Sequence, residues 1–113
     1  FLPRLAGLAR ASGMMLLGDK IGAEQAHEWG LIWKVVDGAE LMTQARDLAT
    51  HLATQPTRGL GLTKRALNAS LVNDLTTQLD VEEALQREAG RTRDFGEGVQ
   101  AFLAKRSPRF EGR

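Results

Sequence analysis

Residues 41–71 read LMTQARDLATHLATQPTRGLGLTKRALNASL, and the spacing of their apolar residues decides the fold class. Successive steps of 4, 3 and 4 residues separate Leu41, Ala45, Leu48 and Leu52. Positions at this spacing share one face of an α-helix. Pro56 ends that helix and suits the first turn of the next. The stretch therefore predicts two consecutive helices.

The second of these helices has apolar residues on two sides. Its stripes are Leu60, Leu67 and Leu71 on one side and Leu62, Ala66 and Ala69 on roughly the opposite side. A helix that is apolar on two sides packs on two sides, so we expect this one to lie centrally. Lys64 falls on the first stripe, where a packed stem with its ammonium group in water is favoured over a functional Lys.

Four more helical pieces are predicted on either side of this stretch. They are expected over residues 8–17 and 23–29, from Leu75 to a stop at Gly90, and from Asp94 to a stop at Pro108. The pair Asn73-Asp74 offers an N-cap to the third. Asp94 and Glu97 form a capping-box-like pair at the start of the fourth.

Residues 31–36, LIWKVV, have a different composition. They are rich in β-branched and aromatic residues and end at the turn pair Asp37-Gly38. Such a run is typical of a short strand, and an extended connector remains the alternative. The predicted fold class is therefore mainly α, with six helical pieces and one short strand near residues 31–36.

Composition excludes several classes of protein. The chain has 113 residues, of which 42% are hydrophobic and 26% are charged, and its net charge is +1. No apolar run approaches the ~18 residues of a membrane helix, and the start lacks the pattern of a signal peptide. The absence of cysteine excludes disulfides, thiolate zinc sites and cysteine nucleophiles. A duplex nucleic-acid binder would carry a stronger positive charge, and we expect a cytoplasmic protein.

Few residues suggest catalysis. His27 and His51 lack the spacing of metal ligands, so we interpret both as structural and expect no metal site. Glu82 lies on a helix face between Leu79 and Leu85. It is either a general acid or base with a raised pKa or a rim residue bonded to Gln86 or to a neighbouring chain, and the second interpretation is favoured.

The C-terminal end is the best functional candidate. Phe102 precedes Lys105 and Arg106 on the last predicted helix, on which Phe95, Val99, Phe102 and Arg106 share a face. Cations near a helix C-terminus also suit the helix dipole, which is the structural interpretation. In the functional one, Lys105 or Arg106 contacts a phosphate and Phe102 offers a flat face to a base.

The order of these signals resembles the C-terminal half of the crotonase superfamily, the enoyl-CoA hydratases and isomerases. The segments that show it include LPRLAG at residues 2–7, LLGDKI at 16–21, TKRALN at 63–68 and EGVQAFLAKR at 97–106. A closer resemblance is to the ring-opening isomerases that act on ring-1,2-epoxyphenylacetyl-CoA in phenylacetate catabolism. It rests on AHEWGLIWKVVD at residues 26–37, HLATQPT at 51–57 and FLAKRSP at 102–108.

The resemblance implies that residues 1–113 are the C-terminal helical and trimerisation region of a larger enzyme. The chain opens at Phe1 without an initiator Met, so we expect a fragment that lacks the N-terminal ββα-superhelix. In the family that superhelix supplies two backbone N–H groups as an oxyanion hole, and upstream carboxylates move the protons. We therefore assign no catalytic residue and expect the 113 residues alone not to turn over crotonyl-CoA.

The resemblance also implies site residues and partners. Phe102 matches an aromatic residue near the adenine of coenzyme A, Lys105 matches a basic residue near its ribose phosphate, and residues 14–17 match part of the acyl pocket. The implied partners are an acyl-CoA thioester and further copies in a homotrimer or a dimer of trimers, with no membrane and no nucleic acid. No cofactor is implied beyond the CoA of the substrate. The alternatives are an ordinary enoyl-CoA hydratase of β-oxidation type and a non-catalytic helical oligomerisation module.

Overall fold

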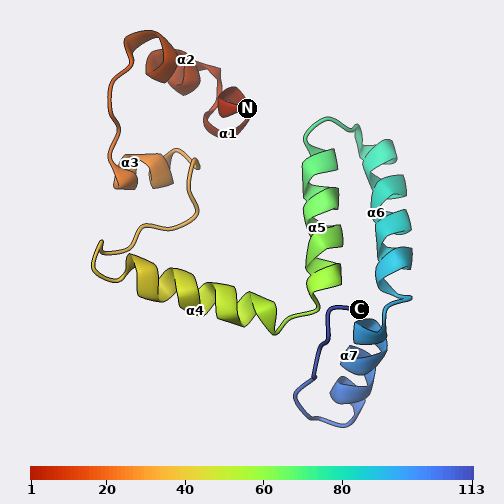
Figure 1. The fold of residues 1–113 in the computed structure, drawn as a ribbon. Coiled ribbons are helices and arrows are strands. Elements are labelled where there is room, and N and C mark those ends of the chain that lie inside the picture. The colour runs from red at the N-terminus through yellow and green to blue at the C-terminus, as the bar shows by residue number, and fades with distance from the viewer. The chain divides into compact units, whose positions relative to one another are not determined.

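Seven helices make up 65% of the chain in the computed structural model, which describes residues 1–113 and contains no strand (Figure 1). They are α1 (Leu2–Ala6), α2 (Leu8–Leu17), α3 (Ala23–Glu28), α4 (Leu41–Ala53), α5 (Thr57–Ser70), α6 (Leu75–Ala89) and α7 (Arg93–Leu103). The chain divides into two compact units, residues 1–42 and 43–113. None of the helices is both long enough and apolar enough to cross a bilayer.

In the first unit α1 packs against α2. The predicted helix over residues 8–17 is confirmed as α2, and it ends at Gly18, whose φ of 72° is left-handed. An L side chain is strained in that conformation, which is why glycine serves here. The sequence did not predict α1, because five residues are too few to show a helical period. Arg10 lies 5.5 Å from the centre of the Trp29 ring, a cation–π contact within this unit.

The predicted strand near residues 31–36 is wrong. Residues 31–33 form a bend and residues 34–36 have no regular structure. A strand is held by hydrogen bonds to a second strand, and these 113 residues contain no other strand. The backbone here is tied locally instead, since Nδ1 of His27 lies 3.3 Å from the Ile32 carbonyl oxygen. The alternative of a connector is the correct one, and it gives His27 a structural contact.

In the second unit α5 and α6 form an antiparallel hairpin (Figure 1). Leu62 is the one large apolar side chain that is buried, with 6% of its surface exposed. The buried Gln78 ties the two helices together, because its Nε2 donates to the Ala66 carbonyl at 3.2 Å. The same amide group bonds Glu82 at 2.9 Å and accepts from Asn73 at 3.1 Å. Glu82 is thus a rim residue, as favoured, but its partner is Gln78 rather than Gln86.

Only one side of α5 is packed within this chain. The side with Leu62 faces α6, whereas Leu67 on the other stripe is 62% exposed and Lys64 beside it is exposed as well. The expectation of a central, two-sided helix is therefore not met by these 113 residues. The physical reason is that no other helix of the unit packs against α5 as α6 does.

Candidate functional site

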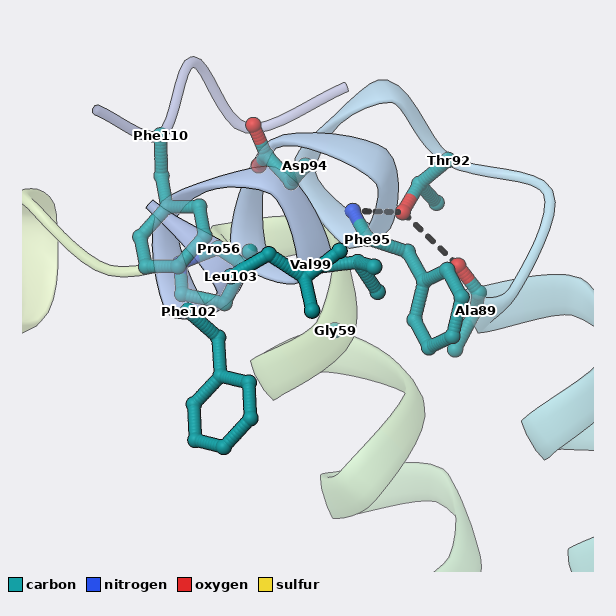
Figure 2. A pocket seen from close by; sticks show the side chains of 11 residues that line it. Pro56, Gly59, Ala89, Thr92, Asp94, Phe95, Val99, Phe102, Leu103 and Phe110 are labelled. Carbon is teal, nitrogen blue, oxygen red and sulfur yellow. Dashed lines mark hydrogen bonds between the residues drawn. The ribbon is translucent and has the colours of Figure 1, made fainter. Parts of the chain in front are cut away.

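An apolar pocket of about 440 Å³ lies where the start of α5, the end of α6, α7 and the C-terminal tail meet (Figure 2). Its lining residues are Pro56, Gly59, Ala89, Thr92, Asp94, Phe95, Gly98, Val99, Phe102, Leu103 and Phe110. Three of the four residues predicted to share the face of the last helix, Phe95, Val99 and Phe102, line it. The Phe102 ring extends away from α7 and is 82% exposed (Figure 2). A flat aromatic face is therefore presented beside an apolar hollow.

The cap of α7 differs from the prediction. The N-cap is Thr92, whose Oγ1 accepts from the Phe95 N–H at 3.1 Å (Figure 2). Asp94 stands inside the first turn of the helix, and Glu97 does not reach back to the cap. The predicted capping box is therefore wrong, because both carboxylates bind the tail that folds back along the helix.

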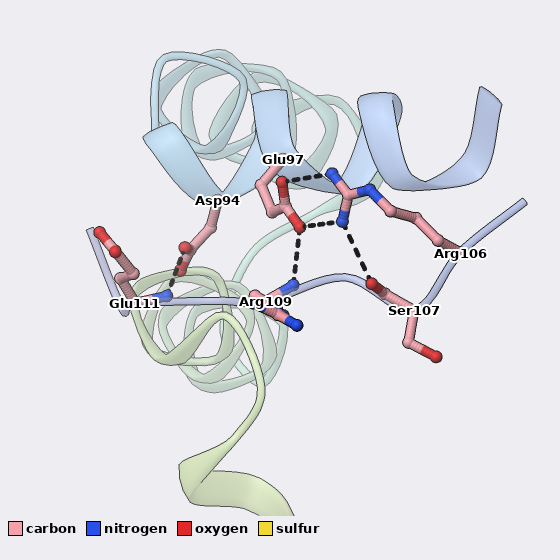
Figure 3. Close-up of polar contacts among 6 residues, drawn as sticks. All are labelled: Asp94, Glu97, Arg106, Ser107, Arg109 and Glu111. Carbon is pink, nitrogen blue, oxygen red and sulfur yellow. Dashed lines mark hydrogen bonds and ion pairs between the residues drawn. The ribbon is translucent and has the colours of Figure 1, made fainter. Parts of the chain in front are cut away.

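Asp94 binds the tail from a buried position, with 3% of its surface exposed. One carboxylate oxygen accepts from the backbone N–H of Glu111 at 2.7 Å (Figure 3). The other accepts from the backbone N–H of Gly112 at 2.8 Å. The Asp94 N–H donates to the Arg113 carbonyl at 3.0 Å. Three hydrogen bonds thus join one residue of α7 to three consecutive tail residues, and the tail brings Phe110 into the wall of the pocket.

The tail also approaches α5 closely. A Cβ atom on Gly112 would lie 2.5 Å from Oγ1 of Thr57, and Gly112 has a φ of 77°. Both the missing side chain and the left-handed backbone therefore require glycine at this position. Tail, α5 and α7 together form three sides of the pocket.

Glu97 is the second residue of α7 whose carboxylate binds the tail (Figure 3). Its carboxylate accepts two hydrogen bonds from the Arg106 guanidinium, at 2.6 and 2.9 Å, and one from the Arg109 N–H at 2.7 Å. These bonds, first those from Arg106, lower the pKa of Glu97 to about 2. The carboxylate is therefore ionised at neutral pH, and the Arg106 guanidinium is held by it.

Phe102 and Lys105 do not share the last helix as predicted. The helix ends at Leu103, and Lys105 has a φ of 51°, the chain's single left-handed residue other than glycine. The Arg106 N–H then bonds back to the Ala101 carbonyl at 3.0 Å. Lys105 and Arg106 therefore lie just beyond the last turn of α7 rather than in it. Pro108 lies five residues past the helix end, so it does not stop the helix.

Of the two cations considered for a phosphate contact, only one is unpaired. Arg106 is bound by Glu97, whereas Lys105 is exposed and has no ion-pair partner. Met15, Leu16 and Leu17, which were matched to part of the acyl pocket, belong to the first unit and are exposed. Asp94 and Phe110 were not predicted as parts of the site. The sequence contains one indication that the tail folds back, namely Gly112 near the end of the charged segment 105–113.

Comparison with known proteins gives the same family throughout the chain. The family model described as enoyl-CoA hydratase/isomerase matches residues 1–113. A 1,2-epoxyphenylacetyl-CoA isomerase of Escherichia coli (strain K12) is 62% identical over 112 residues, which cover 99% of this chain and 43% of the relative. A protein of Rhodobacter capsulatus named as a probable enoyl-CoA hydratase is 49% identical over 113 residues, covering 100% and 44%.

A solved structure agrees with these sequence matches. The crystal structure of an enoyl-CoA hydratase from Bacillus anthracis superposes with a TM-score of 0.91 at 35% identity, covering 99% of this chain and 43% of that chain. The chain therefore spans less than half the length of the relatives it matches. The resemblance to the crotonase superfamily drawn from the sequence is confirmed, and the chain belongs to the enoyl-CoA hydratase/isomerase family.

Proposed function

We propose that this chain is the C-terminal part of an isomerase that acts on ring-1,2-epoxyphenylacetyl-CoA in phenylacetate catabolism. The observation that supports this most strongly is the 62% identity to the Escherichia coli isomerase over 99% of the chain. The identity to the Rhodobacter capsulatus protein named as a probable hydratase is lower, at 49%. As part of this proposal the whole enzyme is cytoplasmic and assembles as a homotrimer or a dimer of trimers.

Within that enzyme, Phe102 and Lys105 contact the CoA part of the substrate. Phe102 is a large apolar side chain that is mostly exposed, and stacking on a planar base would cover it. Lys105 stands three residues further on, with a free ammonium group for a phosphate. Arg106 serves a different purpose, because its bond to Glu97 fixes the backbone immediately after Lys105. The acid–base groups come from the part of the enzyme outside these residues.

The test of this function is an assay of the full-length protein that contains residues 1–113. We expect turnover of ring-1,2-epoxyphenylacetyl-CoA, with much slower hydration of crotonyl-CoA, and no turnover of either thioester by the 113 residues alone. A single Asp upstream accompanies the isomerase, whereas two Glu accompany a hydratase. Rapid hydration of crotonyl-CoA with no product from the epoxide would contradict the isomerase proposal and support the alternative, an ordinary enoyl-CoA hydratase.

Lys105→Ala should weaken the binding of CoA about 10-fold, the effect of losing one charge-assisted bond to phosphate. Binding of dephospho-CoA, which lacks the ribose phosphate, should change little. Calorimetric titration of the full-length protein with both ligands measures the difference. Lys64→Ala is the matched control, because Lys64 is an exposed lysine of α5 outside the pocket. Equal weakening of both ligands by Lys105→Ala would contradict the phosphate contact.

A further inference from the structure

A second hollow of the 43–113 unit is lined mostly by arginine. It has a volume of about 680 Å³ and is formed by the first turn of α5, the end of α6, the α6–α7 link and the last tail residue. Five arginines line it, namely Arg58, Arg87, Arg91, Arg93 and Arg113, together with one carboxylate, that of Glu88. These are five of the eleven arginines of the chain, and none of its four lysines lies there.

The carboxylates around this arginine hollow do not neutralise it. Glu88 is shared between two cations, with Oε1 3.2 Å from Arg58 and Oε2 3.6 Å from Arg65. Arg87 pairs with Glu83 on the outside of α6, and Arg113 pairs with Glu111 at 2.6 Å.

Arg91 and Arg93 remain without a carboxylate partner. They flank the N-cap of α7, and the first turn of an α-helix adds partial positive charge from its N–H groups. Arg113 is held beside them because its carbonyl accepts the N–H of Asp94 at 3.0 Å. Arginines from separate elements therefore line one space, and two of their guanidinium groups have no carboxylate partner.

We propose that the arginine hollow is a binding site for a small, multiply charged phosphate, with inorganic diphosphate as the simplest member of the class. The guanidinium group presents planar pairs of N–H donors that match phosphate oxygens, which distinguishes arginine from lysine at such sites. The hollow is small, and the chain as a whole carries a net charge of only +1, which disfavours an extended nucleic acid. The site is separate from Lys105, which does not line it.

The test is calorimetric titration of the full-length protein with diphosphate, orthophosphate and sulfate at low ionic strength. We expect saturable binding that is tightest for diphosphate and weakens as salt is added. The double variant Arg91→Ala/Arg93→Ala should weaken diphosphate binding at least about 10-fold, the effect of losing one or two charge-assisted bonds. Arg46→Ala, which removes an exposed arginine of α4 outside the hollow, is the matched control and should leave binding unchanged.

Two further measurements test whether the planar donors of arginine are needed and whether CoA competes for the hollow. Arg91→Lys/Arg93→Lys keeps the charge but not the planar donors, so its affinity should lie between those of the parent and the alanine variant. Saturating CoA should leave diphosphate binding intact, because neither Phe102 nor Lys105 lines the hollow. Absence of saturable binding, equal loss in Arg46→Ala, or displacement of diphosphate by CoA would each overturn the proposal. A failure of the isomerase assay would leave this proposal unaffected, since the hollow is defined without reference to the reaction.

Discussion

Leu62→Ala should lower the free energy of unfolding of the 113-residue chain by about 3 kcal/mol. Leu62 is 6% exposed and is the only large apolar side chain buried in the structure. Truncation of a buried Leu removes its transfer free energy and leaves a cavity, which together cost about 2–5 kcal/mol. The other buried apolar residues are alanines, so Leu62 is the largest apolar side chain that the structure buries. Urea denaturation followed by far-UV circular dichroism measures the loss as a shift of the midpoint.

Leu67→Ala on the same helix is the matched control. Leu67 is 62% exposed, so the same truncation removes little buried surface and should cost well under about 1 kcal/mol. Two equal losses would contradict the one-sided packing of α5. In the full-length protein a larger loss for Leu67→Ala than in the chain alone would show that the outer stripe is covered there.

Asp94→Ala should lower the free energy of unfolding by about 2–3 kcal/mol, the second large effect. The carboxylate is almost fully buried and accepts the N–H groups of Glu111 and Gly112 at 2.7 and 2.8 Å. Hydrogen bonds to a charged group contribute about 1.5–3 kcal/mol each, and the released tail residues regain part of this from water. Release of the tail also removes Phe110 from the pocket wall, so the effect extends to the candidate site.

The measurement is again the urea midpoint, combined with hydrogen exchange of the Glu111 and Gly112 amides. Asp94→Asn keeps one acceptor oxygen and should lose less, with one of the two amides still protected. Asp80→Ala is the control, because Asp80 is an exposed residue of α6 whose side chain has no hydrogen bond or ion pair. Unchanged protection of both amides in Asp94→Ala would show that the tail is held without this carboxylate.

Helix ends were predicted well where the residues that cap the helix are close neighbours in the sequence. Gly18 ends α2 and Asp74 caps α6, where its side chain accepts the Thr77 N–H at 2.8 Å. The bond from Thr77 also lowers the pKa of Asp74 below its usual value. Signals of this kind depend on neighbours in the sequence, so they can be identified without the fold.

The predicted hydrogen-bond partners were wrong where a side chain binds residues far away in the sequence. Asp94 and Glu97 have the spacing of a capping box, yet each binds backbone N–H groups of the tail, 12 to 18 residues further on. Arg106 was expected on the helix beside Phe102, but Glu97 holds it beyond the helix end. Residues 31–36 have the composition of a strand but no second strand to pair with. In each case the partner was chosen by tertiary structure.

The sequence by itself determined the helical fold class and the family, because periodicity, caps and segment order are local properties. Only the tertiary structure decided which charges are free. Arg106 and Lys105 are equivalent in the sequence, but one is paired and the other is not. Arg91, Arg93 and Arg113 lie in different elements and meet only when the tail folds back onto α7. Electrostatic interactions depend on distance in space, and that distance is set by hydrogen bonds between residues far apart in the chain.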